Sequence, residues 1–137
     1  SLRMKKLALL LLFVAAFAAC DKGEEDNTQF VLGPVQDVTM ASTYKVDSIS
    51  EITVRYKRPD DCHIFQGFYY QSTGNTRTVA IQYARLDQPN PVPDNQVYEV
   101  PLKFRPQYAG TYVFKFWDGT NDDQTDHFFV AEAVVNQ

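Results

Sequence analysis

The residues best equipped for catalysis in this 137-residue chain are the neighbours Cys62 and His63, a potential nucleophile and a potential base. Adjacent residues of a β-strand point to opposite faces, so these two side chains cannot meet in a regular strand. No Gly-x-Ser-x-Gly turn is present to expose a serine nucleophile. A structural zinc site takes four ligands, and Cys62, His63 and His127 are too few without Asp60 or Asp61. A zinc site is therefore disfavoured. The sequence therefore favours a protein that is not an enzyme, with Cys62 as a structural thiol.

A dense group of oxygen ligands lies in residues 118–126, which are rich in carboxylates and amides. Ca²⁺ takes six to eight oxygen ligands, and a flexible loop can supply them. The spacing does not follow the EF-hand pattern, however, and a solvated hairpin loop explains the same residues. A weak calcium site thus stands as an alternative to a plain loop. Its ligands would be Asp118, Asp122, Asp123 and Asp126.

Aromatic residues are the third candidate, because ten Phe, eight Tyr and one Trp exceed what a small core needs. If the rings at positions 112, 114 and 116 face the core, alternation along the strand turns Trp117 outward. Alternation likewise turns Phe65 and Tyr69 outward, unless a bulge at Gly67 reverses the parity. Grouped exposed rings mark interaction surfaces, so these three residues form a candidate binding surface. The alternative is that Trp117 caps the core beneath a loop.

The elements that would position these residues are strands. After residue 28 the chain shows β-branched and aromatic runs, period-two alternation and turn residues, with no helical period of useful length. In residues 50–57, for example, Ile52, Val54 and Tyr56 share one face. About seven strands at such spacings predict an all-β antiparallel sandwich. The expected strands are an edge strand or pair within 29–40, broken at Gly33-Pro34, and then 50–57, 63–71, 76–86, 97–104, 110–117 and 127–135.

The N-terminal residues have the pattern of a secretory signal. Basic residues precede an unbroken apolar run, residues 7–19, that ends at Cys20. A transmembrane helix needs about 20 apolar residues, so this run is too short to span a bilayer and fits the apolar region of a signal peptide. Met4 has the features of the natural start, so residues 1–3 are expected to be either additions to the natural chain or the result of a wrongly assigned start. Residues 1–19 are therefore expected to be a signal peptide.

The segment Phe17-Ala18-Ala19-Cys20 resembles the lipobox of bacterial lipoproteins, although Leu is usual where Phe17 stands. The resemblance implies cleavage before Cys20, a thioether-linked lipid on its sulfur and stable anchoring to a membrane. The alternative is an ordinary signal peptide that ends in cysteine. Residues 20–27 have no apolar residue after Cys20 and are expected to form a flexible acidic tether. This tether resembles the export signal of surface lipoproteins of the Bacteroidetes group, which implies an outer-membrane, surface-exposed location; a plain linker explains it equally well.

Residues 28–137 are expected to form one domain. Within it, the segment 106–114 resembles the tyrosine corner of immunoglobulin-like sandwiches, where a Tyr near the start of the penultimate strand turns its hydroxyl back onto upstream backbone. Tyr112 would be this Tyr, Gly110 would allow the bend, and Phe114 takes the place of the usual core cysteine. With its lipobox, the chain is thus similar to the small single-domain Ig-like lipoproteins of the Bacteroidetes. That resemblance implies fold and location but no activity.

The formal net charge of the chain is −4, which argues against the basic patch expected of a nucleic-acid-binding domain. We expect a lipid-anchored, non-enzymatic binding or accessory module whose partner is an envelope or surface protein. One alternative is a carbohydrate-binding surface lipoprotein that uses exposed aromatics. Another is a calcium-dependent module or a structural subunit of an envelope complex. No cofactor is expected apart from the covalent lipid on Cys20 and the calcium alternative.

Overall fold

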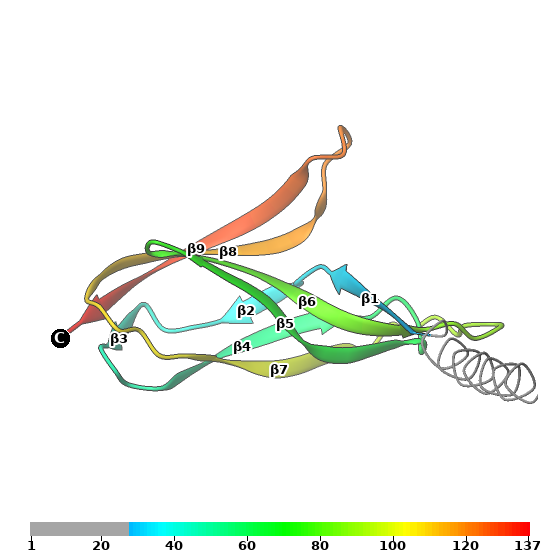
Figure 1. Cartoon of the computed structure of the whole chain (residues 1–137), viewed down its shortest axis with the longest axis horizontal. Helices are drawn as coiled ribbons and strands as arrows, with labels where there is room; N and C mark the ends of the chain where they lie inside the picture. Colours follow the sequence, from blue (N-terminus) through cyan, green and yellow to red (C-terminus); the bar gives the residue numbers. More distant parts are fainter. Residues whose placement is uncertain (1–27) are drawn as a thin grey trace, which may run out of the picture.

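The structure, a computed structural model, describes residues 28–137, which form nine strands and no helix (Figure 1). Within this range nothing is long and apolar enough to serve as a membrane-crossing helix. The expected signal peptide (1–19), the lipidation of Cys20 and the tether (20–27) lie outside the described residues. The strands are β1 (Thr28–Gly33), β2 (Asp37–Thr39), β3 (Thr43–Lys45), β4 (Ser50–Lys57), β5 (His63–Thr73), β6 (Thr76–Leu86), β7 (Val97–Phe104), β8 (Gly110–Thr120) and β9 (Asp126–Asn136).

The strands form two sheets, of six and three strands, that enclose one core (Figure 1). The long strand β6 organises the larger sheet. Strand β5 pairs along one of its edges, and the other edge is shared by β1, which is antiparallel, and β8, which is parallel. Strand β8 continues into a hairpin with β9, and β9 pairs with β3 in parallel. The smaller sheet has the antiparallel order β2-β4-β7.

The chain passes from the larger sheet to the smaller one at Gly33-Pro34, where the sequence predicts a break. The amide of Val35 donates to the carbonyl of Trp117 on β8 at 2.8 Å, and the next amide donates to β4. Residue 33 must be glycine for a steric reason, because a Cβ there would lie 2.2 Å from Cε2 of Tyr83. The chain can therefore cross between the sheets only by approaching this ring closely.

Alternating residues of the facing strands fill the space between the two sheets. Their rings meet largely edge to face, as for Phe104 and Phe114, whose centroids are 5.0 Å apart with an angle of 83° between the ring planes. Such edge-to-face pairs add to the free energy of burial. The central contributions come from three strands: Ile52, Val54 and Tyr56 of β4, Val79, Ile81 and Tyr83 of β6, and Tyr112, Phe114 and Phe116 of β8, all of them buried.

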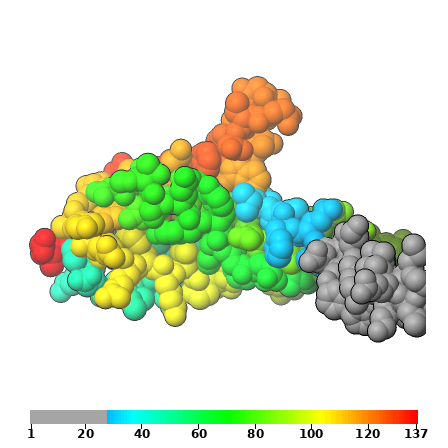
Figure 2. Space-filling view, in the orientation of Figure 1, coloured from blue at the N-terminus to red at the C-terminus, as the bar shows by residue number. Residues whose placement is uncertain are grey.

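The strand count differs from the expected seven in two places. Residues 29–40 contain two strands that belong to different sheets, and the three-residue β3 was not expected, because its partner β9 lies far along the chain. In addition, β8 and β9 extend into residues 118–126, so the loop between them shrinks to residues 121–125. We call this end of the β8–β9 pair the acidic hairpin. The outer part of this hairpin stands away from the rest of the sandwich (Figures 1 and 2).

A β-bulge between Phe65 and Gly67 changes which side chains of β5 face the core. Gly67 has φ +144°, a conformation that residues with a side chain rarely adopt. Because of the extra residue, Phe65 and Phe68 both pack against the core, and the Phe65 ring stacks on Tyr56 with a centroid distance of 5.5 Å. The expectation that Phe65 faces outward is therefore wrong. The alternative, a bulge at Gly67 that reverses the alternation of side chains along this strand, is confirmed.

Candidate functional site

The outer face of the three-stranded sheet is polar and internally paired. Arg55 of β4 places Nη1 2.7 Å from Oδ1 of Asp37 and Nε 3.0 Å from Oε1 of Glu99. Its Nη2 donates to the hydroxyl of Thr39 at 2.7 Å. The hydrogen bonds to the two carboxylates raise the pKa of Arg55. Exposed ion pairs of this kind contribute little to stability, so this face is a solvated surface.

The outer face of the six-stranded sheet carries more exposed apolar side chains, set among polar ones. Its side chains can be identified from the register, because residues directly opposite each other in neighbouring strands share a face. Val79, Ile81 and Tyr83 of β6 face the core, so the residues that alternate with them along β6 face outward. The residues of β1 and β5 that lie directly opposite these alternating residues face outward too. Six of the eleven exposed large apolar side chains found in residues 28–137 lie on this face: Phe30 and Leu32 of β1, Ile64 and Tyr69 of β5, and Val130 and Val134 of β9.

A groove of about 400 Å³ crosses this apolar face where β1, β5, β6, β8 and β9 come together. Ala80 of β6 lies in it and is only 2 % exposed although it points away from the core. The larger side chains around it therefore cover it. They are Leu32, Tyr69, Trp117 and Phe128, and the polar lining is completed by Gln71, Thr78, Lys115 and Asp126.

Two of the three residues expected to form a binding surface, Trp117 and Tyr69, thus line one groove. The indole Nε1 of Trp117 donates to Oδ1 of Asp126 at 3.2 Å, and the Tyr69 hydroxyl donates to Oε1 of Gln71 at 3.0 Å. Lys115 lies with its Nζ 4.5 Å from the centroid of the Phe128 ring, in cation–π geometry. These contacts hold the rings in place, so the groove is a preformed feature of the sheet.

Three of the four carboxylates in the acidic hairpin, those of Asp118, Asp123 and Asp126, bond to different partners. Asp118 bonds to Nδ1 of His127 across the strands, and Asp126 bonds to Trp117 as above. Asp123 accepts hydrogen bonds from the hydroxyl of Thr125 at 2.6 Å and from its amide at 3.1 Å, which lower the pKa of Asp123. A calcium site here stays a prediction. A rise in the thermal midpoint on adding Ca²⁺ would support it, and an unchanged midpoint would exclude it.

Within residues 28–137, three potential metal ligands converge only at Asp60, Asp61 and Cys62, whose ligand atoms lie within 4.8 Å of one another. Oδ1 of Asp60 accepts from Nδ1 of His63 at 2.7 Å and from the amide of Cys62 at 2.9 Å. Oδ1 of Asp61 accepts from the amide of Val92 at 3.0 Å. These carboxylates therefore close a turn and tie it to the loop that follows β6.

The thiol of Cys62 is 3 % exposed and contacts a carboxylate of Asp61, with Sγ 3.7 Å from Oδ1. Burial, and then the charges of Asp61 and Asp60, raise the pKa of the Cys62 thiol. Since the thiolate is the nucleophilic form, this environment disfavours reactivity. The neighbouring His63 is held by Asp60 and packs edge-on against Tyr83, with ring centroids 5.3 Å apart.

An ion pair fastens the loop between β6 and β7 to the sandwich. Nε of Arg58 lies 2.7 Å from Oδ2 of Asp94, and the hydroxyl of Tyr98 donates to the same oxygen at 2.5 Å. The hydrogen bonds from Tyr98 and Arg58 lower the pKa of Asp94 to about 2. The carboxylate is therefore ionised over the whole physiological range and holds the loop in one position.

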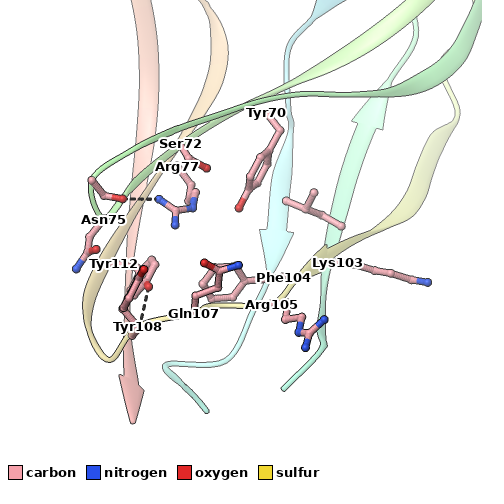
Figure 3. A pocket seen from close by; sticks show the side chains of 12 residues that line it. Tyr70, Ser72, Asn75, Arg77, Lys103, Phe104, Arg105, Gln107, Tyr108 and Tyr112 are labelled. Atoms are coloured by element: carbon pink, nitrogen blue, oxygen red, sulfur yellow. Dashed lines mark hydrogen bonds between the residues drawn. The ribbon is translucent and has the colours of Figure 1, made fainter. Parts of the chain in front are cut away.

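At the opposite end of the sandwich, the hydroxyl of Tyr112 donates to the carbonyl of Tyr108 at 2.8 Å, just after the loop that leads into β8 at Gly110. Beside this contact a cleft opens between the edge strands β5 and β7 (Figure 3). Sequence reasoning missed it, because its lining comes from segments that are distant along the chain. The only local signal is the pair of arginines, Arg77 and Arg105, near strand ends.

Comparison of the chain with protein-family models, with curated proteins and with solved structures found no match.

Proposed function

We propose that this domain is a non-enzymatic binding module that recognises a protein partner through the outer face of the six-stranded sheet. The observation that carries this proposal is the contrast between the two outer faces. One carries six exposed large apolar side chains from β1, β5 and β9, whereas the other carries one, Val97, beside the Arg55 ion-pair network. Contiguous exposed apolar surface is rare on monomeric proteins and marks interaction sites.

The chemistry of the partner follows from what borders this face. The hairpin of β8 and β9 stands away from the rest of the sandwich (Figure 2). Its residues Trp117, Asp126 and Phe128 line the groove, and it carries the carboxylates of Asp118, Asp122, Asp123 and Asp126. A complementary partner would present an apolar surface flanked by lysine or arginine. Such charge complementarity accelerates encounter and fixes orientation more than it adds affinity.

The location and the finer fold belong to the same proposal. The lipobox-like segment supports a lipid on Cys20 that holds the domain at the bacterial outer membrane, with residues 20–27 as the tether. The Tyr112 hydrogen bond and the final hairpin support an immunoglobulin-like arrangement. Two pairings depart from that antiparallel pattern, since β6 runs parallel to β8 and β3 runs parallel to β9. Mass spectrometry of the chain purified from its own membranes would detect the diacylglyceryl group on Cys20.

Site-specific photo-crosslinking in the native envelope tests the protein-binding role. A photoreactive residue at Val130, on the apolar face, should give a discrete adduct, whereas one at Thr53, on the outer face of the smaller sheet, should not. The captured protein, once purified, should bind the chain, and Val130→Asp should weaken that binding by about tenfold or more. Equal adducts at both positions, or none at Val130, would contradict the assignment.

A second candidate function is favoured by the groove itself. Trp and Tyr rings bind sugars by stacking on their faces, and Tyr69 and Trp117 flank a floor of small residues with polar groups at hand. Titration with neutral polysaccharides distinguishes the two functions. A glycan site predicts loss of binding in Trp117→Ala and unchanged binding in Phe30→Ala, which lies on the same face but outside the groove lining. A protein-binding face would be sensitive to both.

A further inference from the structure

The cleft between the sheets is a second concave site, separate from the outer-face groove. It measures about 490 Å³, which lies within the range of small-molecule pockets. One wall comes from the inner face of β5 and the turn into β6, and the other from β7 and the loop that follows it. The inward-facing side chains of two edge strands thus line an opening that the core does not fill (Figure 3).

The charge of this cleft is opposite to that of the protein as a whole. Its lining contains Arg77, Lys103 and Arg105 and no aspartate or glutamate, although the chain has a net charge of −4. Lys103 points away from the others (Figure 3) and lies opposite Glu51 in the register of β4 and β7, on the outer face of that sheet. Arg77 and Arg105 are therefore the charges that matter here. Within residues 28–137 neither arginine has a carboxylate at ion-pair distance, in contrast to Arg55.

Arg77 is held in a fixed orientation. Its Nη1 donates to the carbonyl of Gly74 at 2.8 Å and to that of Thr76 at 3.1 Å. Its guanidinium carbon lies 5.0 Å from the centroid of the Tyr112 ring, in cation–π geometry. The hydroxyl of Tyr70 also faces this guanidinium (Figure 3), so a ligand would share Arg77 with Tyr70 and use the donors that remain. An arginine ordered before binding loses little side-chain entropy when it engages a carboxylate.

The rest of the lining is suited to a polar ring. Tyr70 is 40 % exposed and Tyr108 is 72 % exposed, so both offer ring faces and hydroxyl groups to the cleft. The side-chain amides of Asn75 and Gln107 add donors and acceptors. Rings that stack, amides that bond to hydroxyl groups and an unpaired guanidinium together match a sugar that carries a carboxylate.

We propose that this cleft binds an acidic sugar, a uronate residue of a glycan, with its carboxylate on Arg77 and its ring against Tyr70 and Tyr108, while Arg105 on the opposite wall adds positive charge. The position of the cleft agrees with this role. The cleft lies at the first end of β6, beside the turn that precedes this strand. Thr28, the first described residue, lies opposite Leu86 at the other end of β6. Along an eleven-residue strand these ends are about 35 Å apart. The cleft is thus remote from the point at which the tether joins.

Calorimetric titration of the chain with oligomers of galacturonate, glucuronate and mannuronate, each beside its neutral methyl ester, tests this assignment. At least one uronate oligomer should bind, and its methyl ester about tenfold more weakly or not at all, because the ester removes a charge-assisted hydrogen bond. Arg77→Ala should weaken binding by about tenfold or more, and Arg105→Ala by severalfold. The matched control is Arg85→Ala, which removes the same charge from the same face at the other end of β6 and should leave the affinity unchanged.

Because Arg77 also holds the turn before β6, its alanine variant could unfold. Arg77→Lys keeps the positive charge but loses the two-pronged guanidinium, and Arg105→Ala does not touch the turn. Measuring the thermal midpoint and the affinity of each variant separates loss of folding from loss of binding. Dextran sulfate beside dextran separates a carboxylate site from general anion binding. Failure of every uronate to bind more tightly than its ester would overturn the assignment, as would an equal loss in Arg85→Ala. Trp117→Ala should leave uronate binding unchanged, so the outcome is independent of the outer-face groove.

Discussion

Replacing Gly33 with alanine tests the close packing at the crossing between the two sheets. The new Cβ would lie 2.2 Å from Cε2, 3.0 Å from Cδ2 and 3.2 Å from Cζ of the Tyr83 ring. Carbon atoms in contact are about 3.5–4.0 Å apart, so the ring or the strand would have to move by roughly 1 Å. The ring is 1 % exposed and contacts the rings of Tyr56 and His63 at centroid distances of 5.8 and 5.3 Å. It therefore has little room to move.

Two opposing effects decide the sign of this substitution. Alanine in place of glycine within a strand should stabilise the fold by about 0.5–1 kcal/mol, because the unfolded chain loses less entropy on folding. Overpacking of a filled core costs about 1–3 kcal/mol. We therefore expect Gly33→Ala to lower the free energy of unfolding by about 1–2 kcal/mol. Urea unfolding would show a lower midpoint with an unchanged slope.

A double-mutant cycle assigns the cost to the ring. In a Tyr83→Leu background, which removes the ring atoms that would clash, Gly33→Ala should cost little, so the coupling between the two sites should be about 1 kcal/mol or more. A stabilised Gly33→Ala variant, or an equal cost in both backgrounds, would refute the reasoning.

Three further predictions concern named side chains. Tyr112→Phe should lower the free energy of unfolding by about 1 kcal/mol, because it removes the hydrogen bond from the buried Tyr112 side chain to the backbone carbonyl of Tyr108, and urea unfolding measures the loss. The lowered pKa of Asp94 contributes stability that is fully present above the unfolded-state pKa of about 4 and is lost as the pH falls towards about 2. Thermal melts across this window should therefore show a smaller decline of the melting temperature in Asp94→Asn than in the unchanged chain. In a Cys20→Ser background, iodoacetamide at pH 8 should label Cys62 slowly in the folded protein and rapidly in urea, because burial and the raised pKa suppress its thiolate; equal rates would contradict the burial.

Much of the core could be predicted from alternation alone. The faces assigned to residues 50–57 are confirmed by the burial of Ile52, Val54 and Tyr56, and the parity of 110–117 is confirmed by the burial of its three inner rings. Both predictions succeed because side-chain direction in a strand has period two wherever the backbone stays regular. The same reasoning failed on β5, where one extra residue beside Gly67 turned Phe65 inward.

The sites were less accessible to prediction. Tyr69 and Trp117 were expected to face outward, but nothing local indicates that one groove unites them, since β6 lies between their strands. The cleft depends on Arg77 and Arg105, which are distant along the chain and carry no recognisable spacing. Such sites arise from the order of strands in the sheets and from where the sheet edges separate.

The sequence by itself determined that residues 28–137 are all β and where the inner faces of its regular strands lie, because both depend on backbone preferences and alternation within each segment. Only the tertiary structure decided that β6 takes β1 and β8 on the same edge, that β3 joins β9, and that an arginine-lined cleft separates β5 from β7. Strand order depends on hydrogen bonds and packing between residues far apart in the chain, and no local pattern encodes these contacts.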